Sequence, residues 1–282
     1  MSLKDFAAHL GVGERLISKW EAGAKGIIPR PVNQAALDTS FARLDPESRA
    51  RFKELVSVDV LADTRDPDVP ESGSHRQHPG DGKVMVWIAE GIYLSGYQSE
   101  PQWLDGYWID VFPTTNRDYA LFVTATDYPA PQHWGAELPA REMADHPVVW
   151  VSWEDAQAYS RWAGKALPTA SQWEKAARGT RGNPYPWGVA PTPAKCNVRG
   201  SGPGRTTSVD TYKSGVSPYG VFDMCGNTWE WMDTPTTETR RELKGSAFTS
   251  HFDRVHPAAF NDAHVAMVDD DTGFRCVAVE LS

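Results

Sequence analysis

The stretch of chain from residue 246 to residue 264 concentrates side chains that bind metals or move protons. Its candidate ligands are His251, Asp253, His256, Asp262 and His264. Two histidines and one carboxylate form the open facial triad of non-heme iron oxygenases. His251, Asp253 and His256 are therefore the candidate catalytic residues of an O2-using, metal-dependent oxidase with iron or copper as its cofactor. The alternative is that these histidines are solvated or hold single hydrogen bonds, because their spacing matches no regular element.

Thiol chemistry has few residues available in this chain. The three cysteines are Cys196, Cys225 and Cys276, and an odd number at these separations does not form a disulfide framework. We expect each of them to be a small buried hydrophobic residue. The run Asp269-Asp270-Asp271 offers three carboxylates. Consecutive like charges are typical of a solvated turn, which we favour over a set of metal ligands.

The whole chain has the composition of an ordinary globular protein and an uneven charge. Its 282 residues are 40% hydrophobic and 23% charged, with twelve tryptophans and a net charge of −9. Residues 1–56 contain nine Lys or Arg against seven Asp or Glu, a net of +2, which leaves −11 for the remainder. Any contact with DNA is therefore expected from this front segment alone. The sequence shows no signal peptide and no long apolar run, which predicts a cytoplasmic protein without membrane contact.

The front segment, residues 1–56, predicts a small helical unit. Residues 2–23 read as two short helices joined by a glycine-containing turn. This pattern resembles the Cro/repressor type of DNA-binding domain, whose second helix enters the major groove of double-stranded DNA. The resemblance implies outward, DNA-contacting roles for Arg15, Ser18 and Lys19. The helix that usually precedes the pair is missing, so the alternative is a helical hairpin that packs on a neighbouring surface.

A linker is expected after the helical unit. Residues 57–82 are rich in Pro, Gly and polar side chains, a composition typical of a linker. His75 and His78 lie in this stretch, and we expect both side chains to be solvated. The second domain is then expected to span residues 83–282, where short β-like segments alternate with long runs of Gly, Pro, Asp and Asn.

Two helices stand out within the second domain. Ser152 is followed three residues later by Asp155, and Thr169 is followed in the same way by Gln172. Each pair predicts a capping box at a helix N-terminus. A strand is predicted over residues 84–88 and another over 106–111, since both runs are rich in β-branched and aromatic residues.

Four strings of residues carry a resemblance to a known family. The strings lie within residues 107–116, 146–188, 217–231 and 243–276. The second contains His-Pro-Val-Val-Trp-Val-Ser-Trp and Leu-Pro-Thr-Ala-Ser-Gln-Trp-Glu. The third contains Cys-Gly-Asn-Thr-Trp-Glu-Trp, and the fourth ends in Gly-Phe-Arg-Cys. In this order and spacing, residues 83–278 resemble the formylglycine-generating enzyme (sulfatase-modifying factor) family. The resemblance implies a C-type-lectin-like α+β fold with little regular structure. It implies the family's activity only if the active-site residues are present.

The chain departs from this family at the catalytic cysteines. Members that make formylglycine use two cysteines between the Gly-Ser string and the Gly-Phe-Arg string, and the thiolates bind copper. Counted from Ser246, these positions fall on Thr249 and Arg254, and no cysteine lies between Cys225 and Cys276. A hydroxyl and a guanidinium cannot replace two soft thiolate ligands. We therefore expect that this protein does not make formylglycine.

The family resemblance also implies a calcium cofactor. The family binds Ca²⁺ through positions that match Asp223, Gly226, Thr228 and Glu230, and carboxylates with backbone carbonyls are the hard ligands that this ion prefers. The alternative is that these residues serve turn and capping hydrogen bonds. A second family site begins at the residue that matches Asn197, and its other half falls in a stretch that is shorter here.

Three functions are compatible with these patterns. The favoured one is a non-catalytic regulatory module that binds a peptide or small-molecule ligand, with the front segment on DNA or on a partner. The candidate residues of its ligand groove are Trp229, Thr249, His251 and Arg254, with Trp150, Trp187 and Trp231 as further candidates. The second function is the metal-dependent oxidase described above. The third is a dormant relative that keeps only the fold.

Overall fold

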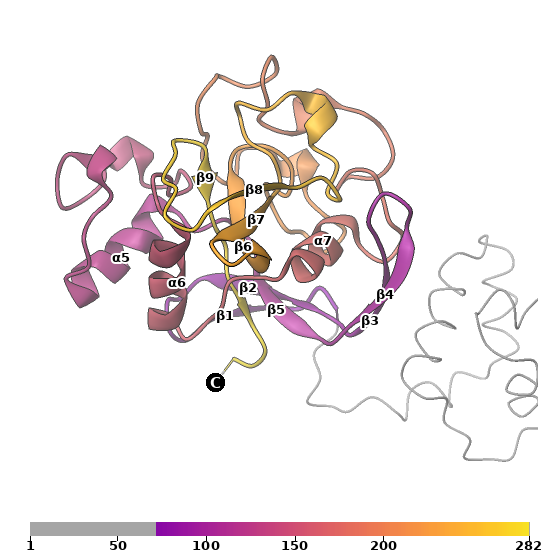
Figure 1. Cartoon of the computed structure of the whole chain (residues 1–282), viewed down its shortest axis with the longest axis horizontal. Helices are drawn as coiled ribbons and strands as arrows, with labels where there is room; N and C mark the ends of the chain where they lie inside the picture. Colours follow the sequence, from indigo (N-terminus) through magenta and orange to yellow (C-terminus); the bar gives the residue numbers. More distant parts are fainter. Residues whose placement is uncertain (1–71, 282) are drawn as a thin grey trace, which may run out of the picture.

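The computed structural model describes residues 72–281, which form a domain of mixed helices and sheets (Figure 1). The strands are β1 (His75–Gln77), β2 (Val84–Ile88), β3 (Gly91–Ser95), β4 (Glu100–Leu104), β5 (Tyr107–Asp110), β6 (Trp229–Thr237), β7 (Arg240–Lys244), β8 (Asn261–His264), β9 (Thr272–Gly273) and β10 (Val277–Ala278). The helices are α5 (Asn116–Thr126), α6 (Trp153–Trp162) and α7 (Ala170–Arg178), with short 3-10 turns η2 (Gln132–Trp134), η3 (Arg141–Met143), η4 (Pro193–Lys195), η5 (Lys213–Gly215) and η6 (Phe252–Arg254). The predicted α+β class is confirmed for these residues.

Two four-stranded sheets and one hairpin make up the β structure of the described residues. One sheet has the order β1-β2-β5-β10 and is antiparallel throughout, while the other has the order β8-β7-β6-β9 and joins β6 to β9 in parallel. Strands β3 and β4 form a separate antiparallel hairpin. Both strands predicted from the sequence, β2 and β5, pair side by side in the first sheet.

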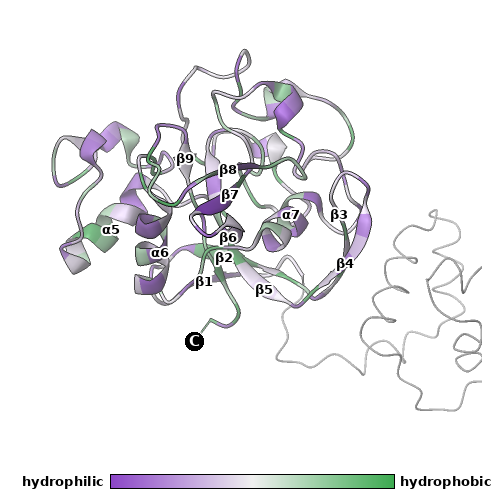
Figure 2. Ribbon diagram, in the orientation of Figure 1, coloured by the Kyte–Doolittle hydropathy of each residue, from purple (hydrophilic) through white to green (hydrophobic). Residues whose placement is uncertain are grey.

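Helix α7 forms because its start and end are both fixed. Thr169 and Gln172 make the predicted capping box, and Gly179 ends the helix at a φ of 67°, a conformation that glycine adopts at little cost. Trp173 and Ala176 on this helix are fully buried against Val86 and other apolar side chains of the first sheet. The hydropathy colouring of Figure 2 places hydrophobic residues along this sheet beneath the helix.

Helices α5 and α6 pack together at the other side of the domain (Figure 1). Ser152 and Asp155 make the predicted capping box of α6. Tyr119 of α5 stacks on Tyr159 of α6, with ring centroids 5.9 Å apart and planes at 13°. Helix α5 is absent from the sequence prediction, although Thr115 begins it with a capping box of the same kind.

The domain begins earlier than the predicted boundary at residue 83. Strand β1 lies in the segment interpreted as a linker and pairs with β2. His78, predicted to be solvated, is only 4% exposed. Nearby, the Asp81 carboxylate accepts hydrogen bonds from Lys165 Nζ at 2.8 Å and from the Tyr159 hydroxyl at 3.0 Å. A buried ion pair of this kind ties the segment to the core, which local composition does not reveal.

The predicted helix-turn-helix unit lies outside the described residues. Its DNA-contacting candidates Arg15, Ser18 and Lys19 therefore remain predictions from the sequence. Among residues 72–281, no helix combines the length and the hydrophobicity that crossing a membrane requires.

Candidate functional site

The two positions where the family carries its cysteines lie on the loop that follows β7. Thr249 is half-buried, and its hydroxyl donates a hydrogen bond to the Asp271 carboxylate. Arg254 is exposed and ends the short turn η6. The structure therefore places a hydroxyl paired with a carboxylate, and a solvated guanidinium, where thiolate chemistry would require sulfur.

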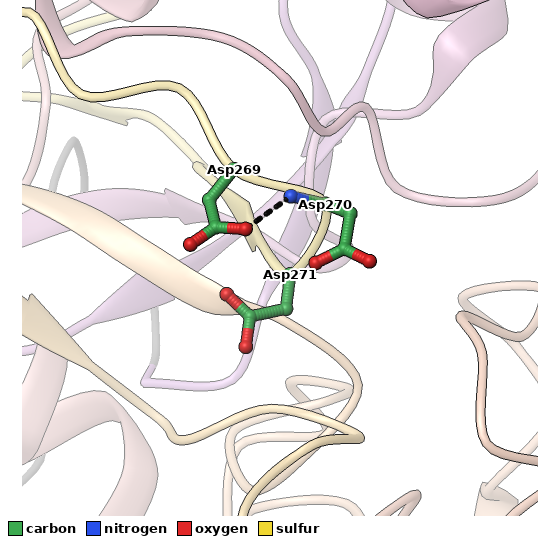
Figure 3. Close-up of side chains that lie close together, drawn as sticks. All are labelled: Asp269, Asp270 and Asp271. Atoms are coloured by element: carbon green, nitrogen blue, oxygen red, sulfur yellow. Dashed lines mark hydrogen bonds between the residues drawn. The ribbon is translucent and has the colours of Figure 1, made fainter.

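Asp269, Asp270 and Asp271 form an acidic loop next to Thr249 (Figure 3). Their carboxylate oxygens lie within 4.8 Å of one another, and residues 72–281 hold no other group of three His, Cys, Asp or Glu side chains whose ligand atoms lie this close together. Burial raises the pKa of Asp271, and burial together with Asp269 raises the pKa of Asp270. The loop is a turn, as predicted, and concentrates negative charge beside the position of the missing thiols.

The acidic loop is bonded to two tryptophans through its backbone. The Trp150 N–H donates to the Asp269 carbonyl and the Trp229 N–H donates to the Asp271 carbonyl, both at 2.8 Å. Trp229 is 7% exposed and Trp150 is 41% exposed. Trp150 has a φ of 59°, which is rare for a bulky side chain and places its ring on the surface. Of these two groove candidates, Trp150 is the one available to a ligand.

The remaining tryptophan candidates are not gathered around this loop. Trp231 is fully buried, and its indole N–H donates to the Val151 carbonyl at 3.0 Å. Trp187 stacks on Tyr185 at 5.2 Å and belongs to the surroundings of a different core cluster. Trp231 serves packing, whereas Trp187 also lines a separate cavity of about 450 Å³.

A small pocket opens beside Trp150. Its volume is about 240 Å³, and its walls include Trp150, Tyr119, Pro129, Pro131, Asp155 and Val268. These residues come from α5, the loop after it, the stretch that leads from Trp150 into the first turn of α6, and the segment before the acidic loop. The sequence did not point to this pocket, because its walls come from four stretches that only the fold brings together. The capping box predicts the role of Asp155 at the start of α6, but it does not indicate that the same side chain also lines a pocket.

The candidate iron ligands are spread over the loop around η6. His251 is exposed, with its Nε2 3.3 Å from Arg199 Nη1, and Asp253 is exposed beside it. His256 is half-buried and stacks on Tyr97, with ring centroids 4.6 Å apart. The ligand atoms of these three side chains do not all lie within 4.8 Å of one another. Their geometry matches the predicted alternative of singly bonded histidines better than a facial triad.

Glu230 is the calcium candidate with the most partners. Its Oε2 accepts from Arg275 Nε at 2.7 Å and from the Trp173 indole N–H at 2.8 Å, while its Oε1 accepts from Arg275 Nη2 at 2.7 Å. Both side chains of this ion pair are fully buried. A bidentate guanidinium neutralises the carboxylate, so Glu230 has little left to offer a cation.

Asp223 and Thr228 of the predicted calcium set, and Asn197 of the predicted second site, have oxygen atoms that suit a cation better. Burial raises the pKa of Asp223 to about 7, and this carboxylate accepts one hydrogen bond, from Asn227 Nδ2 at 2.8 Å. Thr228 Oγ1 and Asn197 Oδ1 are buried and have no hydrogen-bond partner within residues 72–281. Gly226, another residue of the predicted set, has a φ of 80°. A buried carboxylate and buried oxygen atoms without partners are the kind of ligand that Ca²⁺ prefers, and Asp223, Asn197 and Thr228 are the described residues that offer them.

All three cysteines are buried, as predicted. Cys196 and Cys225 share an apolar cluster with Val198 and Val255, and the Cys225 thiol donates to the Val255 carbonyl at 2.8 Å. Burial raises the pKa of the Cys196 thiol to about 12 and that of Cys225 well above its usual range. Cys276 lies in the other main cluster, again with a raised pKa caused by burial. None of these thiols is a reactive thiolate at neutral pH.

Comparison with known proteins shows which family the chain resembles. Residues 71–279 match the model of the sulfatase-modifying factor enzyme 1-like domain. A mouse protein called inactive C-alpha-formylglycine-generating enzyme 2 is 30% identical over 276 residues, covering 72% of this chain and 87% of the relative. The formylglycine-generating enzyme of Thermomonospora curvata is 32% identical and covers 63% of this chain and 84% of its own length.

A solved structure supports the same fold. The structure of PvdO from Pseudomonas aeruginosa superposes with a TM-score of 0.61 at 18% identity, over 74% of this chain and 99% of that one. At this identity the likeness concerns the fold alone. The relatives by sequence include proteins called enzymes and proteins called inactive. The chain belongs to the family of sulfatase-modifying factor, or formylglycine-generating, proteins.

Proposed function

We propose that this protein is a non-catalytic member of the family that binds a peptide or small-molecule ligand at the face around Thr249, Trp150 and the acidic loop. The observation that carries the proposal is the replacement of both thiol positions by Thr249, whose hydroxyl is bonded to Asp271, and by the solvated Arg254. The three cysteines elsewhere are buried. Oxidation of a substrate cysteine through thiolate-bound copper therefore has no sulfur ligands to use.

The surface around Trp150 and the acidic loop supports a binding role. The exposed ring of Trp150 supplies apolar area, and the neighbouring loop supplies three carboxylates. An exposed aromatic side chain with charge beside it is typical of a recognition surface. Burial, and then the neighbouring carboxylates, raise the pKa values of Asp270 and Asp271. A ligand that brings positive charge or hydrogen-bond donors would stabilise the ionised form of these groups.

The absence of formylglycine formation is tested directly on the full chain. The protein is loaded with copper and incubated in air with a cysteine-containing peptide of the sulfatase type, and the peptide is followed by mass spectrometry. We expect the peptide to keep its thiol. Formation of the aldehyde by this protein, with a known formylglycine-generating enzyme as positive control, would overturn the non-catalytic assignment.

The binding role is tested with a displayed random-peptide library panned on the full chain. Peptides recovered from the library are synthesised and titrated by fluorescence polarisation against the double variant Asp269→Asn/Asp270→Asn. We expect at least tenfold weaker binding, since two charges at the rim are removed, and unchanged binding by the matched control Glu100→Gln on β4. Equal affinity of all three proteins would contradict a binding site at this face.

Metal analysis separates the binding module from the oxidase. The binder predicts calcium without stoichiometric iron or copper in the purified protein. Stoichiometric iron or copper that is lost in His251→Ala would instead favour the metal-dependent oxidase with His251, Asp253 and His256 as its ligands.

A further inference from the structure

The pocket beside Trp150 has the shape and chemistry for one small group. We propose that it binds a quaternary ammonium group, such as the trimethylated nitrogen of choline or of a methylated amine. This inference names the ligand chemistry of the site proposed above and rests on that binding role. Three features of the pocket carry it: its size, the exposed ring of Trp150, and a carboxylate whose oxygens already accept hydrogen bonds.

The pocket is small and has two aromatic walls. Its volume of about 240 Å³ suits a compact headgroup, and Trp150 and Tyr119 lie on its walls with Pro129, Pro131 and Val268. The face of a tryptophan ring attracts cations, whereas Tyr119 is 1% exposed and stacked on Tyr159, so its contribution to the wall is apolar packing. Trp150 is 41% exposed, and its backbone N–H bond to the Asp269 carbonyl holds that segment beside the acidic loop.

The charge of the pocket is negative. Among the described residues that line it, the charged one is Asp155. The field of this carboxylate is visible in its neighbours: burial and Asp155 together raise the pKa of Tyr119, and the same two causes raise the pKa of Tyr128 to about 12. Both phenols resist ionisation first because burial disfavours the charged form, and then because a second negative charge beside Asp155 is unfavourable. A cation in the pocket is favoured by the same field.

The carboxylate is already occupied by hydrogen bonds. Asp155 Oδ2 accepts from the Ser152 N–H at 2.8 Å and from the Ser152 hydroxyl at 2.7 Å, and Oδ1 accepts from the Tyr128 hydroxyl at 2.8 Å. A guanidinium brings five N–H donors and a primary ammonium three. Buried donors without acceptors are costly. A quaternary ammonium has no N–H, so it gains the electrostatic attraction without that cost.

The position of the pocket extends the recognition surface. Val268 on its wall directly precedes Asp269, and the acidic loop adds three carboxylates next to it. A ligand with its methylated nitrogen in the pocket would therefore have its remaining part over the acidic loop and Thr249. Cationic and hydrogen-bond-donating groups on that remaining part would match the charge of the loop.

The test is isothermal titration calorimetry of the full chain with choline. The comparison ligand is the neutral tert-butyl analogue of choline, in which carbon replaces nitrogen and the shape is kept. We expect choline to bind at least tenfold more tightly than the analogue, and ammonium and guanidinium ions to bind more weakly than tetramethylammonium. Trp150→Leu, which keeps an apolar side chain but removes the ring, is expected to weaken choline binding at least tenfold.

Two controls keep the outcome readable. Trp187→Leu removes a half-buried tryptophan outside the pocket and is expected to bind choline as the wild type does. The melting temperature of every variant is measured first, so that a loss of folding is recognised. Equal binding of choline and its neutral analogue, or full binding by Trp150→Leu, would overturn this inference. If library peptides still bind while choline does not, the binding role stands and the quaternary ammonium is excluded.

Discussion

Asp223 is the residue whose environment has the clearest energetic consequence. Its carboxylate is buried and accepts one hydrogen bond, and burial raises its pKa to about 7. A folded pKa above the unfolded value means that the folded protein prefers the protonated form. In the absence of a cation, this group therefore costs stability above pH 7, and the cost disappears as the pH falls from 7 towards the ordinary carboxyl range.

Replacement of Asp223 by Asn tests this directly. In chelator at pH 8, Asp223→Asn is expected to raise the free energy of unfolding by about 2 kcal/mol, since the buried charge is removed, and the effect should vanish near pH 4. Excess calcium is expected to stabilise the wild type, by about 2.7 kcal/mol at one hundred times the dissociation constant, but not the variant. Thermal unfolding measures both, and an equal calcium effect on the exposed-site control Asp253→Asn and on Asp223→Asn would exclude Asp223 as a ligand.

Individual site residues differ in how far the sequence could predict them. The loss of both thiols could be predicted from the sequence, because the spacing from Ser246 places the two cysteine positions of the family at Thr249 and Arg254. The partner of Thr249 was not, since Asp271 lies 22 positions away and only the fold brings the two together. The surface position of Trp150 also escaped prediction, because it depends on a left-handed backbone conformation that this residue type rarely adopts.

Among the elements, α7 has the boundary that is easiest to test. The Thr169 hydroxyl caps the helix by accepting from the Gln172 N–H at 3.2 Å, and the Thr169 side chain is exposed. Thr169→Ala therefore removes the cap without leaving a cavity and is expected to cost about 1 kcal/mol of stability. Thr169→Ser keeps the hydroxyl and serves as the matched control. Urea unfolding monitored by circular dichroism measures both, and an unchanged midpoint in Thr169→Ala would refute the capping role.

The elements show why local signals succeed and fail. Helices α6 and α7 were predicted because capping boxes and stop residues lie within one short stretch. The sheet of β6, β7 and β8 was missed, since the first four residues of β6 are all buried and show no alternation of polar and apolar positions. Strand β9 has two residues and pairs in parallel with β6, which only distant parts of the chain can specify.

At the scale of the whole molecule, four histidines with lowered pKa values predict a response to acid. Burial and Lys165 lower the pKa of His78, and burial also lowers the pKa of His133, His146 and His256. The folded protein then binds a proton less readily than the unfolded chain. The stability from these neutral rings is complete above pH 6.5 and is lost as the pH falls through their lowered folded values.

His78→Gln tests the part of this response that comes from the least exposed of these rings. The wild type is expected to lose stability steeply below pH 6.5, by roughly 1 kcal/mol or more for a fully buried ring, and the variant is expected to lose less over the same interval. His75→Gln is the matched control, because that side chain is exposed on β1. Melting temperatures between pH 5 and pH 8 provide the measurement, and identical profiles for His78→Gln and the wild type would contradict the assignment.

Residues 75–81 are bound to the core of the domain, and this determines where a shortened protein must begin if it is to stay folded. A shortened protein that starts at residue 83, where the composition changes, would lack β1 and the Asp81 carboxylate that lies 2.8 Å from Lys165 Nζ. Lys165 would keep Asp110 as its buried partner, and β2 would expose an unpaired edge to neighbouring molecules. Such a fragment is expected to aggregate, whereas one that starts before His75 retains its own protection against self-association.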